Sequence, residues 1–116
     1  MKTNRVVFAW NRPLPGREGA SGQLFQTFLE YLGAQQRAGH IDSFEPIFLE
    51  PRGNTVNGFI LISGDPQKLR DLTESAEWVR LQTKAIINLD GVSVVGGVSG
   101  ALLQERMQTW LEEIPR

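Results

Sequence analysis

Hydrophobic residues near the start of the chain follow a strand-like pattern and then change to a helical spacing. Branched and aromatic side chains fill residues 5–10, and Pro13, Pro15 and Gly16 follow, which predicts a strand that runs into a loop. From about residue 17 or 21 to residue 38, apolar side chains recur every three or four positions, as on one face of a helix. Gly39 then provides a helix stop.

The remaining strand-like runs lie in the middle and near the end of the chain. Residues 44–50 and 57–63 are separated by a short link of turn-forming residues, which favours antiparallel pairing in a hairpin. Residues 92–98 predict a last strand, and apolar positions in 101–114 return to helical spacing. We therefore expect a terminal helix after the last strand.

The helix between these strands carries two start signals. Asp65 before Pro66 is typical of an N-cap followed by proline in the first turn. Ser75 offers a second cap, so we expect the helix to break or bend near Thr73 and to end at Gly91.

The predicted order is β-α-β-β-α-β with an extra C-terminal helix. This split arrangement gives a four-stranded antiparallel sheet with both crossover helices on one face. We therefore predict an α+β fold of the ferredoxin-like type, formed as a single domain by residues 1–116.

The first strand is apolar on both faces. Val6, Phe8 and Trp10 share one face, and residues 7, 9 and 11 share the other. Two crossover helices cover one face only, so the terminal helix or a second subunit has to cover the other. A homodimer joined sheet to sheet is the simpler answer. We assign Val6, Phe8 and Trp10 to its interface, and the smaller side chains to the helix-covered face.

Composition and charge narrow the class of protein. The chain is 41% hydrophobic and 22% charged, as in ordinary globular domains. It has no cysteine, which excludes disulfides, thiolate metal sites and a cysteine nucleophile. A net charge of -1 disfavours a nucleic-acid partner. No apolar run has the roughly 20 residues that a membrane span needs, and the first is too short for a signal peptide. We expect a soluble, cytoplasmic protein.

Several segments resemble the dimeric α/β-barrel superfamily, and within it the antibiotic-biosynthesis-monooxygenase-like group. They are residues 6–12 (VVFAWNR), 15–17 (PGR) and 75–78 (SAEW), together with the element order. The resemblance implies a homodimer whose two sheets form a barrel, with a small pocket between each sheet and its helices. Some members of this group are cofactor-free oxygenases, and others degrade haem.

The haem-degrading relatives use an asparagine near the end of the first strand, and a tryptophan and a histidine on the second helix. Asn11 matches the asparagine, whereas Leu72 and Gln82 stand where the tryptophan and the histidine are expected. The single histidine of the chain, His40, cannot supply a two-histidine metal site. We therefore expect neither haem nor a metal nor any other cofactor.

Candidate pocket residues follow from the predicted topology. Asn11 at a strand end could orient a substrate oxygen, and Trp78 on the second helix could form a wall, with Trp10 as a further residue able to border a pocket. Ala9 would leave room beside Asn11, and His40 is the only imidazole available. Each has a plainer interpretation: a turn residue for Asn11, core packing for the tryptophans and an exposed helix-end residue for His40.

Three functions remain open. The first is a small-molecule pocket protein or a cofactor-independent enzyme, and the second is a dimeric structural or regulatory module without chemistry. The third, an RNA-binding domain, ranks last because such domains expose aromatic and basic residues on their central strands, whereas residues 60–62 are aliphatic. A cavity with convergent polar groups would favour ligand binding over the module.

Overall fold

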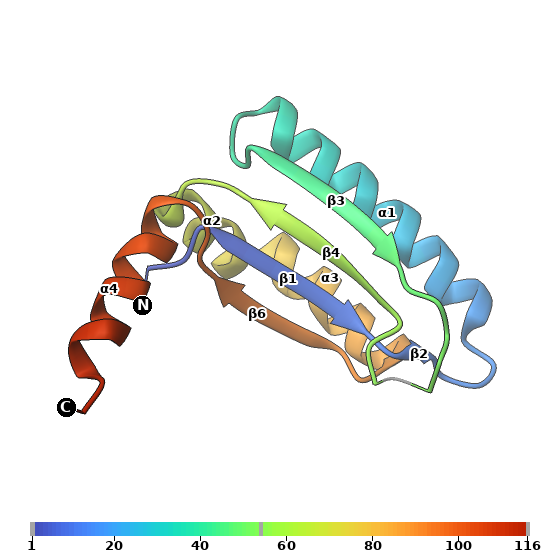
Figure 1. Cartoon of the computed structure of the whole chain (residues 1–116). Helices are drawn as coiled ribbons and strands as arrows, with labels where there is room; N and C mark the ends of the chain where they lie inside the picture. Colours follow the sequence, from blue (N-terminus) through green and yellow to red (C-terminus); the bar gives the residue numbers. More distant parts are fainter. Residues whose placement is uncertain (1, 54, 116) are drawn as a thin grey trace.

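The computed structural model describes residues 2–53 and 55–115, and its main feature is a four-stranded antiparallel sheet with helices packed on one of its faces (Figure 1). The strand order in this four-stranded sheet is β3-β4-β1-β6. Its strands are β1 (Arg5–Trp10), β3 (Ser43–Phe48), β4 (Gly58–Ser63) and β6 (Ser93–Gly97). The helices are α1 (Glu18–Arg37), α2 (Pro66–Glu74), α3 (Ala76–Asn88) and α4 (Ala101–Glu113). This α+β arrangement is compatible with the ferredoxin-like plan.

Both predicted helix starts in the middle of the chain are confirmed. The Asp65 side chain accepts hydrogen bonds from the backbone N–H groups of Gln67 and Lys68, each at 3.1 Å. The Ser75 hydroxyl accepts one from the backbone N–H of Trp78 at 3.3 Å, and it separates α2 from α3. Because these caps satisfy N–H groups that lack partners inside a helix, they fix where each helix begins.

The core lies between the sheet and helices α1, α2 and α3. On β1, Val6 faces Ile62 of β4 across the ladder, and Phe8 faces Ile60. These side chains pack with residues of all three helices, which are Leu24, Phe28, Tyr31, Leu32, Leu69, Leu72, Trp78, Leu81 and Ala85. A short second ladder pairs β2 (Arg12–Pro13) with β5 (Leu89–Asp90) and closes one end of the layer.

The assignment of the two faces of β1 has to be corrected. Val6 and Phe8 are only 5% and 3% exposed and belong to the helix-covered core, and Trp10 packs against the same cluster. Residues 7 and 9 lie on the uncovered face instead. Alternation along a strand defines two faces, but it does not say which one meets the helices. The large side chains are needed on the helix side, because they reach across the space between the layers.

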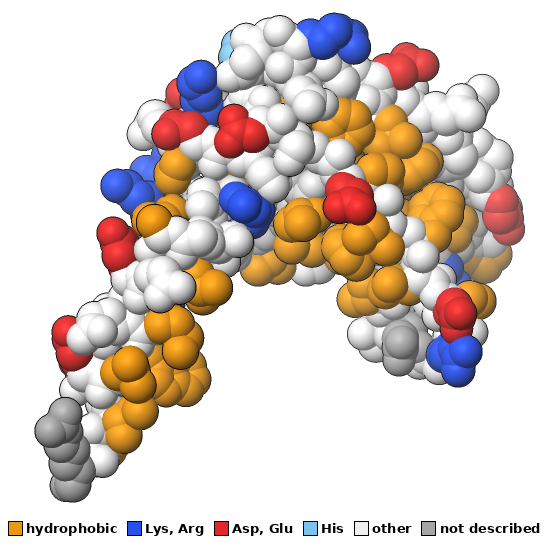
Figure 2. Space-filling model, turned by 45° about the horizontal axis from the view of Figure 1, so that its top comes forward, with side chains coloured by type: hydrophobic (Ala, Val, Ile, Leu, Met, Phe, Trp, Pro, Cys, Tyr) orange, Lys and Arg blue, Asp and Glu red, His pale blue; other side chains and the backbone are white. Residues whose placement is uncertain are grey.

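The other face of the sheet has no helix over it, and α4 does not cover it. Helix α4 begins after Gly100, whose φ is +65°, and projects from the end of the sheet (Figure 1). None of its residues is buried. Figure 2 shows hydrophobic side chains along α4 and along the concave side of the molecule next to it. The middle of this uncovered face is apolar. Its apolar members on three strands are Val7, Ala9, Phe59, Leu61 and Val95, and the polar residues on the same face include Arg5, Glu45, Ser63 and Ser93.

Candidate functional site

A cavity of about 260 Å³ opens between the sheet and α1, beside the end of β1. We call it the aromatic cavity, because its walls include Phe8, Trp10, Phe25, Phe28 and Phe48. These rings come from β1, α1 and the edge strand β3, so the fold brings distant parts of the chain together here. The rest of the lining is mainly aliphatic.

The rings at the mouth of the aromatic cavity contact one another edge to face or tilted. The Trp10 ring centre lies 5.8 Å from that of Phe25 and 6.2 Å from that of Phe48, with interplanar angles of 67° and 85°. Phe25 and Phe48 are 5.2 Å apart. Such pairs stabilise each other beyond simple burial. Phe48 is nevertheless 71% exposed, so the mouth of the cavity is open to solvent.

The position of Trp10 depends on a glycine in the neighbouring strand. Gly58 of β4 lies opposite Trp10 in the ladder. A Cβ atom at position 58 would approach the Trp10 ring carbon Cζ2 to 2.6 Å, which is too close for any side chain. The indole therefore lies against the bare backbone of Gly58, and this contact holds Trp10 at the cavity wall.

Two polar side chains that line the aromatic cavity, Ser21 and Glu18, already have partners. The Ser21 hydroxyl donates to the backbone carbonyl of Asn88 at 3.2 Å, and a Glu18 carboxylate oxygen accepts from the Gly16 N–H at 3.2 Å. Within the described part of the chain, no group of three or more His, Cys, Asp or Glu side chains is placed to hold a metal ion. The cavity is therefore built for apolar contact, and its lining offers no nucleophile paired with a base.

Asn11 lies outside the aromatic cavity and joins loop segments. Its Oδ1 accepts a hydrogen bond from Asn57 Nδ2 at 2.5 Å, and its backbone N–H donates to the Asp90 carbonyl at 2.9 Å. Its Nδ2 also lies 3.5 Å from Asp90 Oδ2. These contacts connect the end of β1 with the loop before β4 and with β5. They are the contacts of a residue that organises a turn region.

Trp78 and Ala9 also lie away from the cavity surface. Trp78 is 0% exposed, and its Nε1 donates to Gln82 Oε1 at 2.8 Å. Its ring meets Phe8 edge to face at 6.0 Å and Phe28 at 5.4 Å, so it supports two of the cavity rings from behind. Ala9 is 6% exposed and belongs to the uncovered face of the sheet.

His40 lies in a separate hollow of about 310 Å³ on the outside of α1 and α2. Its Nδ1 is 2.7 Å from Gln35 Oε1. The same hollow contains Tyr31, whose pKa is raised by burial and by the negative charge of Glu77, while a hydrogen bond with Ser75 acts in the opposite direction. The predicted pocket residues Asn11, Trp78, Ala9 and His40 are thus not brought together.

Sequence reasoning missed Phe25, Phe48 and Gly22 as cavity residues. Phe25 was visible only as part of the apolar stripe of a helix, and Phe48 only as part of a strand. The usable signal was an excess of aromatic residues in segments that must be neighbours, namely β1, the start of α1 and the end of β3. Without the register of β3 on β4, that signal does not show which aromatic rings meet.

No protein-family model matches the chain, and neither the curated proteins nor the solved structures contain a significant match to it. None of the helices in the described residues combines the length and the apolar character needed to cross a membrane.

Proposed function

We propose that this chain is a homodimeric binding protein for a small apolar or aromatic molecule, which is held in the aromatic cavity. The observation that carries the proposal is an open cavity walled by Trp10, Phe25 and Phe48. A dry apolar cavity of about 150 Å³ is known to hold benzene. At about 260 Å³, the aromatic cavity has room for a larger, fused-ring molecule.

Binding, rather than catalysis by the protein's own groups, agrees best with the lining. Glu18 is the carboxylate at the cavity, and it already accepts a hydrogen bond from the backbone. Cofactor-free oxygenase-like chemistry, which the family resemblance implies for some members, would therefore depend on a substrate that is itself reactive. We place this activity second to simple binding.

The homodimer is part of the proposal because the sheet has an uncovered apolar face. The ferredoxin-like strand order and the resemblance to dimeric α/β barrels both favour a second copy on this face. The interface we now propose contains Val7, Phe59, Leu61 and Val95. Burying such a face is favourable by about 25 cal/mol per Å² of apolar surface. Val6 and Phe8, which lie in the core of each subunit, are not part of it.

Two glycines of α1 provide a matched test of the binding site. A Cβ atom at Gly19 or at Gly22 would meet no atom within 4 Å, but only Gly22 lines the aromatic cavity. We expect Gly22→Leu to fill the cavity and to weaken binding of indole or naphthalene by about tenfold or more, which corresponds to about 1.4 kcal/mol. Gly19→Leu should leave binding unchanged. Titration calorimetry of both variants and the wild type measures this.

Two outcomes of these titrations would count against binding in the aromatic cavity. If Gly19→Leu and Gly22→Leu bind the probes as well as the wild type does, the probes occupy another place. If neither probe binds the wild type at millimolar concentration, the alternative function gains weight. That alternative is a dimeric structural or regulatory module, which the uncovered sheet face and the exposed apolar side chains of α4 favour.

Two valines provide a matched test of the homodimer. Val95 on the uncovered face is 55% exposed, and Val79 on α3 is 49% exposed. We expect the wild type to have the mass of a dimer in light scattering at micromolar concentration. Val95→Asp should give the monomer, because a carboxylate would be buried without a partner, whereas Val79→Asp should remain dimeric. Dissociation by Val79→Asp alone would place the interface on α3.

A further inference from the structure

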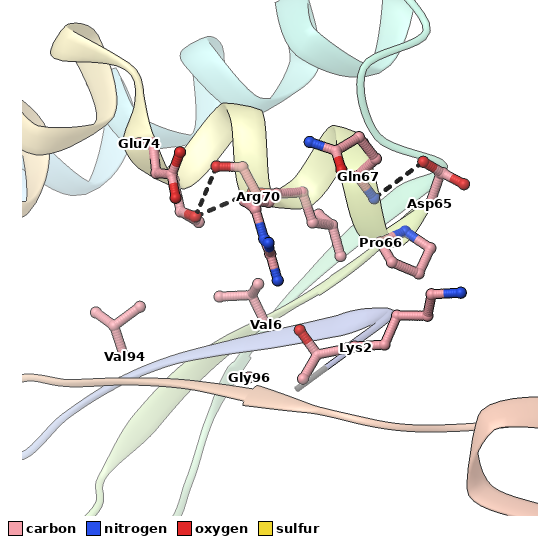
Figure 3. Close-up of a pocket in the computed structure, with 12 residues that line it drawn as sticks. Lys2, Val6, Asp65, Pro66, Gln67, Arg70, Glu74, Val94 and Gly96 are labelled. Atoms are coloured by element: carbon pink, nitrogen blue, oxygen red, sulfur yellow. Dashed lines mark hydrogen bonds between the residues drawn. The ribbon is translucent and has the colours of Figure 1, made fainter. Parts of the chain in front are cut away.

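A second cavity, of about 590 Å³, lies at the opposite end of β1 from the aromatic cavity. Figure 3 shows residues that line it. Helix α2 forms one wall, and strands β1 and β6 form the other. None of the described residues lines both cavities, so this site is independent of the function proposed for the aromatic cavity. We call this one the α2 cavity.

The α2 cavity has a cation directed into it. Figure 3 shows the Arg70 side chain extending from α2 toward Val6 and Gly96 on the strands. Among residues 2–53 and 55–115, the Arg70 guanidinium has no hydrogen-bond acceptor and no ion-pair partner. The ion pair in this part of the chain joins Arg52 to Glu50, away from the α2 cavity. Lys2 adds a second positive charge at the cavity.

The acidic side chains at the α2 cavity do not neutralise Arg70. Asp65 is engaged as the cap of α2, where its Oδ2 accepts hydrogen bonds from Gln67 and Lys68 at 3.1 Å. Glu74 lies one turn after Arg70, but it forms no ion pair with it. Both carboxylates nevertheless add negative potential, so the cavity suits an anion with a single charge better than one with two.

The floor of the α2 cavity is aliphatic. Val6 and Leu69 are buried core residues that reach this surface, at 5% and 2% exposed, and Val94 is half-buried beside them. The N-terminal segment packs closely against β6 here. A Cβ atom at Gly96 would lie only 3.0 Å from the Thr3 side chain. The α2 cavity thus combines a cationic group with an aliphatic surface.

We propose that the α2 cavity binds a small carboxylic acid that has an aliphatic chain. A guanidinium presents paired N–H donors that match the two oxygens of a carboxylate, which gives strong and directional hydrogen bonds. The chain of the ligand would lie on Val6, Leu69 and Val94. The volume of the cavity exceeds the need of an anion alone, which is why the aliphatic part belongs to the proposal.

Octanoate is the probe for this site, and three related compounds isolate its parts. Octanol has the chain without the charge, acetate has the charge with almost no chain, and inorganic phosphate has more than one charge. We expect octanoate to bind more tightly than each of them by about tenfold or more, as measured by titration calorimetry. Equal affinity for octanol, acetate or phosphate would overturn the proposal, as would no binding of octanoate at millimolar concentration.

The matched variants are Arg70→Gln and Arg80→Gln. Both arginines are exposed helix residues, but only Arg70 lines the α2 cavity, so both variants should fold. We expect Arg70→Gln to weaken octanoate binding by about tenfold or more, and Arg80→Gln to change it by less than about twofold. Equal effects would indicate general charge attraction and would overturn the site. Gly22→Leu should leave octanoate binding unchanged, and loss of binding in that variant would place octanoate in the aromatic cavity.

Discussion

Helices α3 and α4 have the same length and similar patterns, but they have opposite environments. Each has 13 residues and carries one tryptophan. In α3, Trp78 is 0% exposed, whereas Trp110 of α4 is 68% exposed. Helix α3 buries Leu81 and Ala85 as well, and α4 buries nothing. An apolar stripe at helical spacing therefore predicts that a helix has a face to bury, but not that its own chain covers that face.

The difference arises where each helix begins. Helix α3 follows α2 directly, through the Ser75 cap, and is thereby held against the sheet. Helix α4 follows Gly100, which adopts φ +65° and ψ -132° and turns the chain away from the sheet edge. The apolar stripe of α4 is left to solvent in the single chain, next to the uncovered face of the sheet (Figure 2).

The sharpest test of this comparison replaces each tryptophan by alanine. Trp78→Ala removes a fully buried ring that contacts Phe8 and Phe28, so we expect the free energy of unfolding to fall by about 3–5 kcal/mol. Trp110→Ala should change it by less than about 0.5 kcal/mol. Denaturant unfolding measures both in the Val95→Asp background, which we expect to be monomeric. Similar losses in the two variants would mean that α4 packs on its own domain.

The sequence predicted the elements well because their signals are local. The cap residues Asp65 and Ser75 each act within one turn, and the alternation in β1 needs only neighbouring residues. The sequence failed where an answer depends on contacts between distant segments. It placed Val6 and Phe8 on the wrong face of the sheet, because either face of an apolar strand can meet the helices.

The candidate site was harder to predict than the fold for the same reason. Trp10 was recognised as a residue that could border a pocket, and it does line the aromatic cavity. Its partners Phe25 and Phe48 depend on the register of β3 and on the angle of α1, which no local pattern encodes. The position of Asn11 at a strand end predicts a pocket residue, yet its amide connects loops.

The helix starts give a second test, with a smaller effect. Ser75→Ala removes the side-chain acceptor of the Trp78 N–H, and we expect a loss of about 1 kcal/mol in the free energy of unfolding. Helix α4 has no side-chain cap to lose. Adding one by Gly100→Ser should not stabilise the protein, because φ at this position is unfavourable for any residue with a Cβ atom.

Urea unfolding of both variants measures this pair, with Lys84→Ala on the exposed side of α3 as the control. An unchanged stability of Ser75→Ala would mean that packing of Trp78 alone fixes the start of α3. A gain from Gly100→Ser would contradict the backbone conformation that directs α4 away from the sheet.

The smallest expected effect is the loss of folding stability that the buried Tyr31 causes at alkaline pH. Tyr31, the one tyrosine of the chain, is buried on α1, and its pKa is raised by burial first and by Glu77 in addition, with the Ser75 hydrogen bond lowering it in part. In the unfolded chain the phenol ionises near its ordinary pKa of about 10. Because the folded state keeps the proton to higher pH, stability is complete below about pH 10 and falls as the pH rises toward the folded pKa.

Tyr31→Phe should remove this part of the alkaline loss. Ultraviolet titration of the single phenol and urea unfolding between about pH 8 and pH 11 measure both quantities. If the phenol of the folded wild type ionises at the ordinary value, or if Tyr31→Phe loses stability with pH as steeply as the wild type, then Tyr31 is in contact with water and the packing between α1 and the start of α3 is looser than described.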